Sequence, residues 1–404
     1  MSQSSSRTRA PTLWSGPFVI ASVANLLTGM GVMLMLHLPG LLERWGESKT
    51  TIGVFVAAMA VGSIAVRPFA GLVMDGGRGR RPVILVAGVA HVVACAGYLA
   101  VSDAGPLLLG VRVLHGLAGG ALFASLFTTA ADLVPAQRRT EGLALFGVSG
   151  MLPVALGGVV GDLVLAHADY RELFLVCVGC TSAALLVALA LPETGAPRGP
   201  DAVRANALRG RGFFAVAAQR DLLPIWVVGI AFAGALGTAY AFLKPFVLSE
   251  HVGSVGLFYG WYAAMAIALR LTLGWLPDRL GPKRVLAPSL LAISVALAAL
   301  SLARTPLAIG AAGALAGLGH GFAFPILTGL TAGRSRDEER GSALSLFTAV
   351  FDVGLLAGPS FGMLAEATSL RTMFLVAAAV PLLGGAVFYV WEARSITPAA
   401  RSAS

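Results

Sequence analysis

The chain has 404 residues, of which 57% are hydrophobic and 12% are charged. Soluble domains carry roughly 45–50% apolar and about 25% charged residues, so this composition excludes a water-soluble globular protein. Fifty glycines and 21 prolines exclude a coiled coil, and three cysteines are too few for a disulfide scaffold. The formal net charge of +9 indicates either a nucleic-acid-binding protein or a membrane protein, and the positions of the charges decide between them.

Twelve apolar segments are long enough to cross a bilayer as helices. Crossing requires roughly 20 apolar residues at about 1.5 Å rise each, whereas barrel strands would alternate over about 10 residues. The sequence therefore predicts an all-α polytopic membrane protein with twelve transmembrane helices. We expect these helices at 16–38, 51–73, 82–101, 106–131, 141–165, 172–192, 223–247, 254–276, 284–303, 306–332, 341–366 and 371–392.

The Lys and Arg residues are distributed unevenly over the segments between the predicted helices. If the N-terminus is cytoplasmic, 20 of the 29 lie on the cytoplasmic side, five lie on the other side and four lie within helices. Cytoplasmic segments of membrane proteins carry an excess of Lys and Arg, so both termini are expected in the cytoplasm. The basic charge then faces anionic lipid rather than nucleic acid.

A polar segment at 193–222 separates the first six predicted helices from the last six. It is expected to be a cytoplasmic linker with a short amphipathic helix at 202–219. The predicted organisation, in chain order, is a cytoplasmic N-terminal tail (1–15), a six-helix bundle (16–192), the linker (193–222), a second six-helix bundle (223–392) and a cytoplasmic C-terminal tail (393–404).

The two predicted bundles share a motif between their second and third helices. An Arg, a Gly and an Asp of the first bundle recur in the second at a constant offset of 203 residues, and a basic run follows each copy. Such repeats are typical of secondary transporters, whose substrate site lies near the bilayer midplane between the halves. The residues of the two copies are Arg67, Gly71, Asp75, Arg80 and Arg81, then Arg270, Gly274, Asp278, Arg279 and Arg284.

This loop resembles the signature loop of the major facilitator superfamily, and the twelve helices and central linker match that family over nearly the whole chain. The resemblance implies two pseudo-symmetric bundles that expose a small-molecule site alternately to each side of a bacterial inner membrane. It also implies a monomer that contacts lipid and no nucleic acid. The runs that begin at Arg67, Arg112 and Ala131 resemble a branch of bacterial exporters. Gly76 departs from the pattern, because it stands where the loop usually has arginine.

The acidic residues of the two loops are candidate gate residues. Asp75 and Asp278 lie at the predicted cytoplasmic ends of helices. A carboxylate there can bind a neighbouring arginine and the positive N-terminus of another helix. The resemblance implies that Asp75 contacts the eleventh helix. Because the first copy lacks an arginine, the two loops are unequal, and we expect Asp75 to matter more than Asp278 for turnover.

Two charges inside the predicted helices have no counterpart in the other half. Arg112 lies in the fourth helix, and Asp352 lies about 16 Å into the eleventh, near the bilayer centre. Charges within a bilayer are costly and mark functional sites. We predict that Asp352 carries the coupling proton and that Arg112 helps to set its protonation. Arg67 and Arg270 occur in both halves, so they are expected to serve the fold or the gate.

The family resemblance also implies that helices 1, 4, 7 and 10 line the substrate cavity. The candidate lining residues on these helices are Asn25, Arg112, Tyr240, Lys244 and His320. A lysine and an arginine in the cavity would favour substrates that carry a carboxylate or another anionic group. Asp162 and Glu366 lie near helix ends and are expected at the membrane interface.

Metal, redox and nucleotide chemistry are not indicated by the sequence. His91, His115 and His320 are expected to be packed or hydrogen-bonded histidines, because no two of them stand at i,i+4. Cys177 and Cys180 lie within an apolar helix and are expected to be buried thiols. No phosphate-binding loop and no catalytic motif occurs, so neither a cofactor nor an enzymatic activity is expected.

The predicted function is proton-coupled export of a small organic molecule, a drug or a metabolite, by alternating access. Two alternatives remain open: a proton-coupled importer of a sugar or organic acid, and a lipid flippase or transporter-like sensor. The run from Ala155 to Asp162 lacks the Gly-Pro pair that is usual in the fifth helix of antiporters, and Gly358-Pro359 in the eleventh helix carries it instead.

Overall fold

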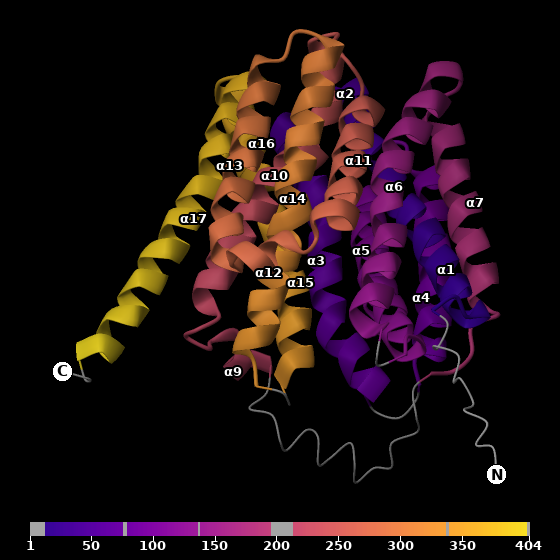
Figure 1. Ribbon diagram of the computed structural model, residues 1–404. Helices are drawn as coiled ribbons and strands as arrows, with labels where there is room; N and C mark the ends of the chain where they lie inside the picture. The colour runs from indigo at the N-terminus through magenta and orange to yellow at the C-terminus, as the bar shows by residue number, and fades with distance from the viewer. Residues whose placement is uncertain (1–12, 76–78, 136–137, 195–212, 337–338, 402–404) are drawn as a thin grey trace, which may run out of the picture.

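The computed structural model describes residues 13–75, 79–135, 138–194, 213–336 and 339–401. All regular elements in these ranges are helices (Figure 1). Twelve helical segments are long and apolar enough to cross a membrane, which confirms the predicted number and the all-α class.

Each of the twelve segments is formed by one to three helices. The first half contains α1 (Gly16–Met33), η1 (Leu34–His37), α2 (Leu38–Arg44), α3 (Lys49–Asp75), α4 (Arg81–Gly97), η2 (Tyr98–Ala100), α5 (Pro106–Leu133), α6 (Arg139–His167) and α7 (Tyr170–Ala188). The second half contains α9 (Phe213–Ala217), α10 (Leu223–Ser249), α11 (Val255–Leu273), α12 (Leu276–Leu280), α13 (Pro282–Leu302), α14 (Pro306–Arg334), α15 (Arg340–Leu355), α16 (Gly358–Ala367) and α17 (Leu370–Arg401). The first span is longer than predicted, because it continues through η1 and α2 to Arg44.

The first and eleventh spans are interrupted near prolines. The short 3₁₀ helix η1 separates α1 from α2, and Pro39 lies in the first turn of α2. Between α15 and α16, the amides of Leu356 and Ala357 bond to carbonyls three residues back, at 3.1 and 3.2 Å, and Pro359 follows. Proline has no amide proton, so it is tolerated in the first turn of a helix, where Pro39 and Pro359 both lie. Proline alone does not cause the break, because α3 and α6 continue through Pro68 and Pro153. The eleventh span therefore consists of two helices joined by a short turn.

The two halves lie side by side (Figure 1). We call the lower end in that view, where the described chain stops at 194 and resumes at 213, the linker end, and we call the opposite end the far end. Between the halves, α6 packs against α11, and α3 packs against α15 and α16. These helices are therefore the ones that must slide or separate if the halves move.

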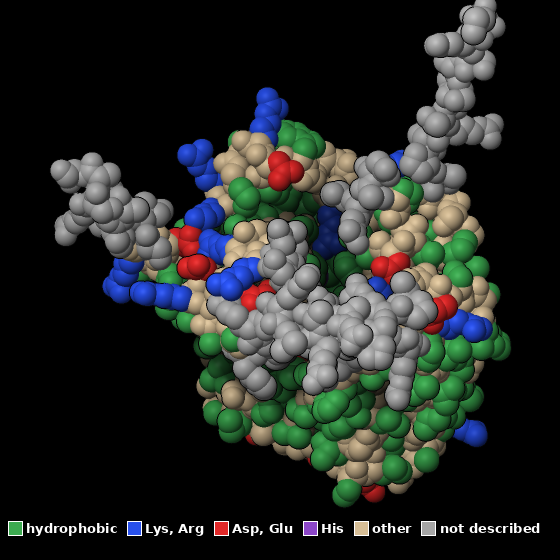
Figure 2. Space-filling view, turned by 90° about the horizontal axis from the view of Figure 1, so that it is seen from below, with side chains coloured by type: hydrophobic (Ala, Val, Ile, Leu, Met, Phe, Trp, Pro, Cys, Tyr) green, Lys and Arg blue, Asp and Glu red, His purple; other side chains and the backbone are tan. Residues whose placement is uncertain are grey.

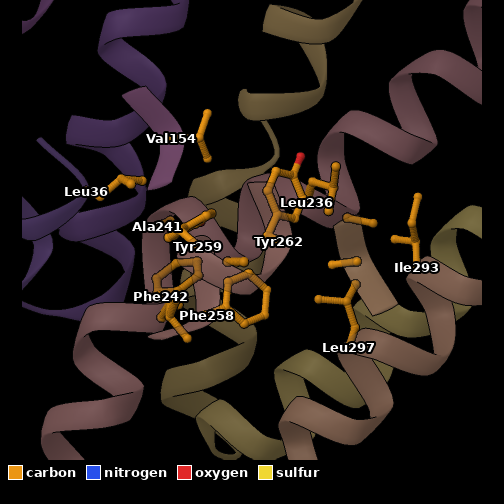
Figure 3. Close-up of a cluster of buried hydrophobic side chains, with 14 of the residues drawn as sticks. Leu36, Val154, Leu236, Ala241, Phe242, Phe258, Tyr259, Tyr262, Ile293 and Leu297 are labelled. Atoms are coloured by element: carbon orange, nitrogen blue, oxygen red, sulfur yellow. The ribbon is translucent and has the colours of Figure 1, made fainter. Parts of the chain in front are cut away.

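Among the described residues, buried apolar side chains form two clusters. The larger cluster contains residues of both halves, and Figure 3 shows Leu36 and Val154 of the first half with Phe242 and Tyr259 of the second. The smaller cluster belongs to the first half alone and includes Phe18 in the first turn of α1, near the linker end. A shared core thus joins the halves, whereas the first half has a separate core near the linker end.

Close backbone contacts join the halves toward the far end. A Cβ atom on Gly53 would lie 2.4 Å from the carbonyl oxygen of Gly358, and one on Gly158 would lie 3.1 Å from the Cα atom of Gly256. These pairs join α3 to α16 and α6 to α11. Small residues allow helix backbones to approach this closely in a membrane. The glycines in the run from Ala155 to Asp162 therefore have a packing role.

The predicted linker and C-terminal tail are covered in part. The amphipathic helix expected at 202–219 lies mostly outside the described residues, and α9 occupies its last part. Helix α17 continues past residue 392 to Arg401, so the described part of the expected tail extends the twelfth helix.

Candidate functional site

A hollow opens between the two halves at the linker end. Figure 2 views the molecule from that end and shows basic side chains (blue) in the depth of the hollow. The helices that meet between the halves are α3 and α6 from the first half and α10, α11, α15 and α16 from the second. Polar side chains on these helices are therefore the first candidates for a site that both sides of a membrane could reach.

An ion pair crosses between the halves in the middle of the molecule. The Nη2 atom of Arg67 on α3 lies 2.5 Å from Oδ2 of Asp352 on α15, and Nε of Arg67 donates to the same oxygen at 3.0 Å. Ser63 donates a third hydrogen bond to that oxygen at 2.8 Å, and Arg67 also donates to the hydroxyl of Thr348 at 2.6 Å. The Arg67 side chain is 7% exposed and that of Asp352 is 16% exposed. The pair is therefore largely shielded from solvent and joins α3 to α15 across the two halves.

Arg112 does not contact Asp352, which corrects the expected partnership. Its Nε atom donates to the carbonyl oxygen of Phe55 at 2.8 Å, and its Nη1 atom donates to the hydroxyl of Tyr98 at 3.4 Å. Both partners belong to the first half, and Arg112 is 4% exposed. Position along a helix does not give the direction in which a side chain points, so the sequence could not tell which cation faces Asp352. The cation beside Asp352 is Arg67, which sequence reasoning had assigned to the fold or the gate.

A second polar cluster joins the halves near the far end. Asp162 on α6 accepts a hydrogen bond from the amide of Gly256 at 2.6 Å, in the first turn of α11. The Nζ atom of Lys244 and the Nδ1 atom of His37 lie 3.6 and 3.7 Å from the other carboxylate oxygen of Asp162. A carboxylate at a helix N-terminus is favoured by the helix dipole. Asp162 is therefore a link between the halves rather than only an interfacial charge.

Glu366 makes a comparable link at the far end. Its two carboxylate oxygens accept hydrogen bonds from the amide and the hydroxyl of Thr50, both at 2.8 Å. These bonds join α16 to the first turn of α3, where a Cβ atom on Gly362 would also lie 2.4 Å from the carbonyl oxygen of Lys49. A cavity of about 460 Å³ lies at the same end and is lined in part by Lys244. Lys244 thus belongs to the far end and not to the linker-end hollow.

Aromatic rings surround His320 in the second half. The hydroxyl of Tyr262 is hydrogen-bonded to Nδ1 of His320, and the rings of Phe232 and Phe324 lie 5.5 and 5.6 Å from the imidazole. In the described part of the chain, the buried Nε atom of Arg270 has no hydrogen-bond partner. An aromatic wall beside a guanidinium with spare donors can hold a flat organic molecule and an anionic group.

The other two cavity candidates lie in different surroundings. Asn25 on α1 is 7% exposed and donates to the hydroxyl of Ser149 at 2.9 Å, which ties α1 to α6 within the first half. The ring of Tyr240 on α10 lies 5.4 Å from that of Tyr259. The five predicted lining residues are therefore spread over the interior, and His320 has the surroundings best suited to bind an organic molecule.

The first signature loop is held within the first half. Arg80 lies 2.6 Å from a carboxylate oxygen of Asp132, and the amides of Arg80 and Arg81 donate to Glu193 at 2.7 and 3.1 Å. Gly79 has a φ of +82°, and a Cβ atom there would lie 2.3 Å from the Glu193 carboxylate, so glycine is required. The side chain of Asp75 and the surroundings of Gly71 lie outside the described residues, so the predicted contact of Asp75 with the eleventh helix stays a prediction.

The second signature loop forms the short helix α12. Gly274 caps α11, Asp278 is exposed, and the guanidinium of Arg279 lies 5.6 Å from the centre of the Trp275 ring. Arg284 is exposed in the first turn of α13. Nearby, Lys283 and Arg334 both pair with Glu392. The ion pairs described at the linker end thus stay within one half each. Toward the far end, the pairs Arg44–Asp169 and Arg371–Glu250 also stay within one half. The pair of Lys244 with Asp162 crosses between the halves.

The sequence and the twelve-span architecture match one family of membrane proteins. The sequence matches the Major Facilitator Superfamily over residues 18–253 and 225–404. The chain belongs to this superfamily. It is therefore a multi-pass membrane transporter of a family that carries small molecules and does not consist of enzymes, as its twelve spans and repeated loops predict.

Relatives of this superfamily member match most of the chain or about two thirds of it. The multidrug resistance protein MdtG of Escherichia fergusonii is 25% identical over 396 residues, which cover 94% of each chain. A chloramphenicol resistance protein of Pseudomonas aeruginosa is 25% identical over 267 residues, which cover 63% of this chain and 59% of that protein.

Solved structures share the fold at lower identity. The human organic anion transporter MFSD10 (TETRAN) is 19% identical with a TM-score of 0.68, and the match covers 92% of this chain and 98% of that one. The nucleoside transporter NupG, as its D323A mutant, is 13% identical with a TM-score of 0.75, and the match covers 93% of this chain and all of that one.

Sequence reasoning missed the residues that complete the central pair. Ser63 stands four residues before Arg67, so both lie on the same side of α3, and this spacing could have marked Ser63 as a partner. Thr348 similarly precedes Asp352 by four residues on α15. A signal of this kind identifies one helical face, but it does not say which face of another helix it meets.

Proposed function

We propose that this transporter exports a small organic molecule in exchange for protons, and that Asp352 carries the coupling proton. The observation that supports the proposal is the pairing of Asp352 with Arg67 across the two halves. A proton on Asp352 removes the charge that Arg67 binds, so protonation and the separation of α3 from α15 become linked equilibria. The 16% exposure of the Asp352 side chain leaves a route for that proton.

The linker end is proposed to face the cytoplasm, with both termini on that side. The excess of Lys and Arg in the segments at this end supports the assignment. The hollow then opens to the cytoplasm, which is where an exporter loads its substrate. The names of the relatives, a multidrug resistance protein and a chloramphenicol resistance protein, favour export of organic compounds.

The proposed cycle uses Arg67 to release the proton inside. With Asp352 charged and paired, the substrate enters from the cytoplasm, and the far end opens when the contacts of Asp162 and Glu366 separate. A proton from outside then neutralises Asp352 and frees Arg67. When the halves return, the approach of Arg67 favours the charged carboxylate and expels the proton.

Substrate contacts are proposed for the aromatic wall around His320, with Arg270 available to an anionic group. Asn25, Tyr240, Lys244 and Arg112 stay candidates as lining residues. The signature-loop charges, among them Asp75 and Asp278, are proposed to form the cytoplasmic closure when the hollow shuts.

The decisive experiment is transport by Asp352→Asn in proteoliposomes. We expect transport driven by an imposed pH gradient to fall by at least tenfold, whereas substrate exchange at equal pH continues, because the amide cannot carry the proton. Asp169→Asn, an exposed carboxylate at the far end, serves as the control and should keep both activities. Gradient-driven transport at the normal rate in Asp352→Asn would show that another group carries the proton.

A further inference from the structure

A buried cluster of metal-ligating side chains lies inside the first half, on the side of α3 away from Asp352. His91 and Cys95 on α4 and His115 on α5 are each at most 1% exposed. One ligand atom from each of the three lies within 4.8 Å of the others. His91 and Cys95 stand at i and i+4, a spacing that places two ligands on one face of a helix. The transport mechanism above uses none of these three residues.

The geometry of the cluster is close to that of a metal site. The two Nε2 atoms of His91 and His115 lie 2.9 Å apart. Around a tetrahedral zinc ion, with Zn–N distances of about 2.0–2.1 Å, two such nitrogens would lie roughly 3.3 Å apart. The other nitrogen of His115, Nδ1, lies 3.0 Å from the hydroxyl of Tyr98. Metal-binding histidines usually hold their second nitrogen in this way, which fixes the ring orientation.

A fourth donor lies beside the cluster. The thiol of Cys177 on α7 is 0% exposed and lies near that of Cys95, and it donates to the carbonyl oxygen of Gly31 at 3.7 Å. A cavity of about 10 Å³ borders His91 on its other side and is lined in part by Thr28 and Thr181. A void of this size holds about one water molecule, so small side-chain shifts can admit one ion.

We propose that His91, Cys95 and His115, with Cys177 as the fourth ligand, bind a single transition-metal ion of the zinc class. Thiolate and imidazole together select zinc or cuprous ions over hard cations such as Mg²⁺. With two thiolates a zinc site carries no net charge, which suits an apolar interior. Binding releases one proton from each thiol. The proton between the two imidazoles moves from Nε2 to Nδ1 of the same ring, so both histidines stay neutral, and Nδ1 of His115 donates to the Tyr98 hydroxyl.

Such an ion would tie α4, α5 and α7 together as a rigid body. Three helices of the first half would then move as a unit when the halves rock. The three side chains are at most 1% exposed, so we expect the ion to be a structural element of the bundle and not the transported substrate.

The test measures zinc in the full-length protein, purified through a tag that contains no histidine. We expect about one zinc per chain after incubation with Zn²⁺ and dialysis, and none after the same treatment with Mg²⁺. Cobalt should give a thiolate-to-cobalt absorption band. Zinc should also raise the midpoint of thermal unfolding. In Cys95→Ser and His115→Gln, we expect zinc affinity to fall by at least tenfold and the shift in the midpoint to disappear.

Cys180→Ser is the matched control, because Cys180 is a partly exposed thiol on the same helix as Cys177 and lies outside the cluster. It should bind zinc as the unaltered chain does. Failure of the unaltered chain to bind zinc or to change its unfolding midpoint would overturn the proposal, and this measurement stands even if a ligand variant does not fold. Equal zinc binding by a folded Cys95→Ser protein would also overturn it.

Discussion

The two ends of the transporter are held by different kinds of contact. At the far end, glycine pairs bring backbones of opposite halves together, and Asp162 and Glu366 add hydrogen bonds across the same boundary. At the linker end, the described ion pairs join Arg80 to Asp132 and Arg334 to Glu392, each within one half. If the halves move, we expect the contacts between them to separate, whereas the ion pairs within one half are expected to persist. The linker end can close and the far end can open only if the pair of Arg67 and Asp352 allows the halves to move.

Among the variants considered for these contacts, Arg67→Gln is expected to lower transport the most. It leaves the Asp352 carboxylate buried without its cation, and breaking a buried pair in this way typically costs about 3–5 kcal/mol. We expect both gradient-driven transport and exchange at equal pH to fall roughly 100-fold. The double variant Arg67→Gln/Asp352→Asn should recover exchange but not driven transport, because no unpaired charge remains. Flux assays on the three proteins check this, and full driven transport in Arg67→Gln would contradict it.

A smaller effect is expected from Gly53→Ala at the far end. The new Cβ atom would lie 2.4 Å from the carbonyl oxygen of Gly358, and only while the far end is closed. Overpacking costs about 1–3 kcal/mol, which shifts the population toward an open far end roughly 5–150-fold. Distances between labels placed across the far end measure the shift. Gly110→Ala, where nothing lies within 4 Å of the added atom, is the control and should leave the distances unchanged.

Lys244→Ala tests whether Lys244 binds the substrate or helps to hold the far end closed. Its Nζ atom lies 3.6 Å from Asp162, which keeps its bond to the Gly256 amide when the lysine is removed. We expect transport to fall only a few-fold, within the roughly 0–1 kcal/mol of an ion pair that keeps some contact with solvent. The loss should be equal for anionic and cationic substrates. A selective loss for anionic substrates would place Lys244 in the binding site instead.

The smallest effect is expected from the exposed ion pairs at the far end. The Arg44 guanidinium and the Tyr170 amide hold the pKa of Asp169 below its usual range, and Arg371 does the same for the pKa of Glu250. A lowered pKa stabilises the fold above the unfolded value of about 4, and this contribution is lost only as pH falls through the folded value. The pH profile of transport between about 5.5 and 8 should therefore be the same in Asp169→Asn and the unaltered protein. A displaced profile would show that this pair takes part in coupling.

The sequence was sufficient to predict the spans and the two halves. Each span is a run of about 20 apolar residues, and this requirement of the bilayer can be read without knowing any contact. The expected depth of Asp352 in the bilayer comes from the same rise per residue along a helix. Its partner did not, because a one-residue step turns a helix by about 100°, and the rotation of α3, α5 and α15 about their axes depends on packing. Arg67 rather than Arg112 therefore faces Asp352.

The His91–Cys95 spacing was also visible in the sequence, but its meaning was not. The sequence shows too few cysteines for a disulfide scaffold, and no two of its histidines stand four residues apart. Neither pattern points to a metal site that combines histidine with cysteine. His115 joins the cluster because α4 packs against α5, a contact between helices whose apolar faces look alike in the sequence. Conversely, Gly358-Pro359 stands out in the sequence for its family pattern, and in the structure it begins α16 directly after the turn that divides the eleventh span.

The turn between α15 and α16 divides the eleventh span into two rods with separate tasks. The rod α15 carries Asp352, and the rod α16 carries Gly358 and Glu366, which contact the far end of α3. A compound that stiffened this joint would hold the two rods in one arrangement while the substrate path stayed empty. Inhibition of that kind would be non-competitive, and a rising concentration of the exported compound would not overcome it.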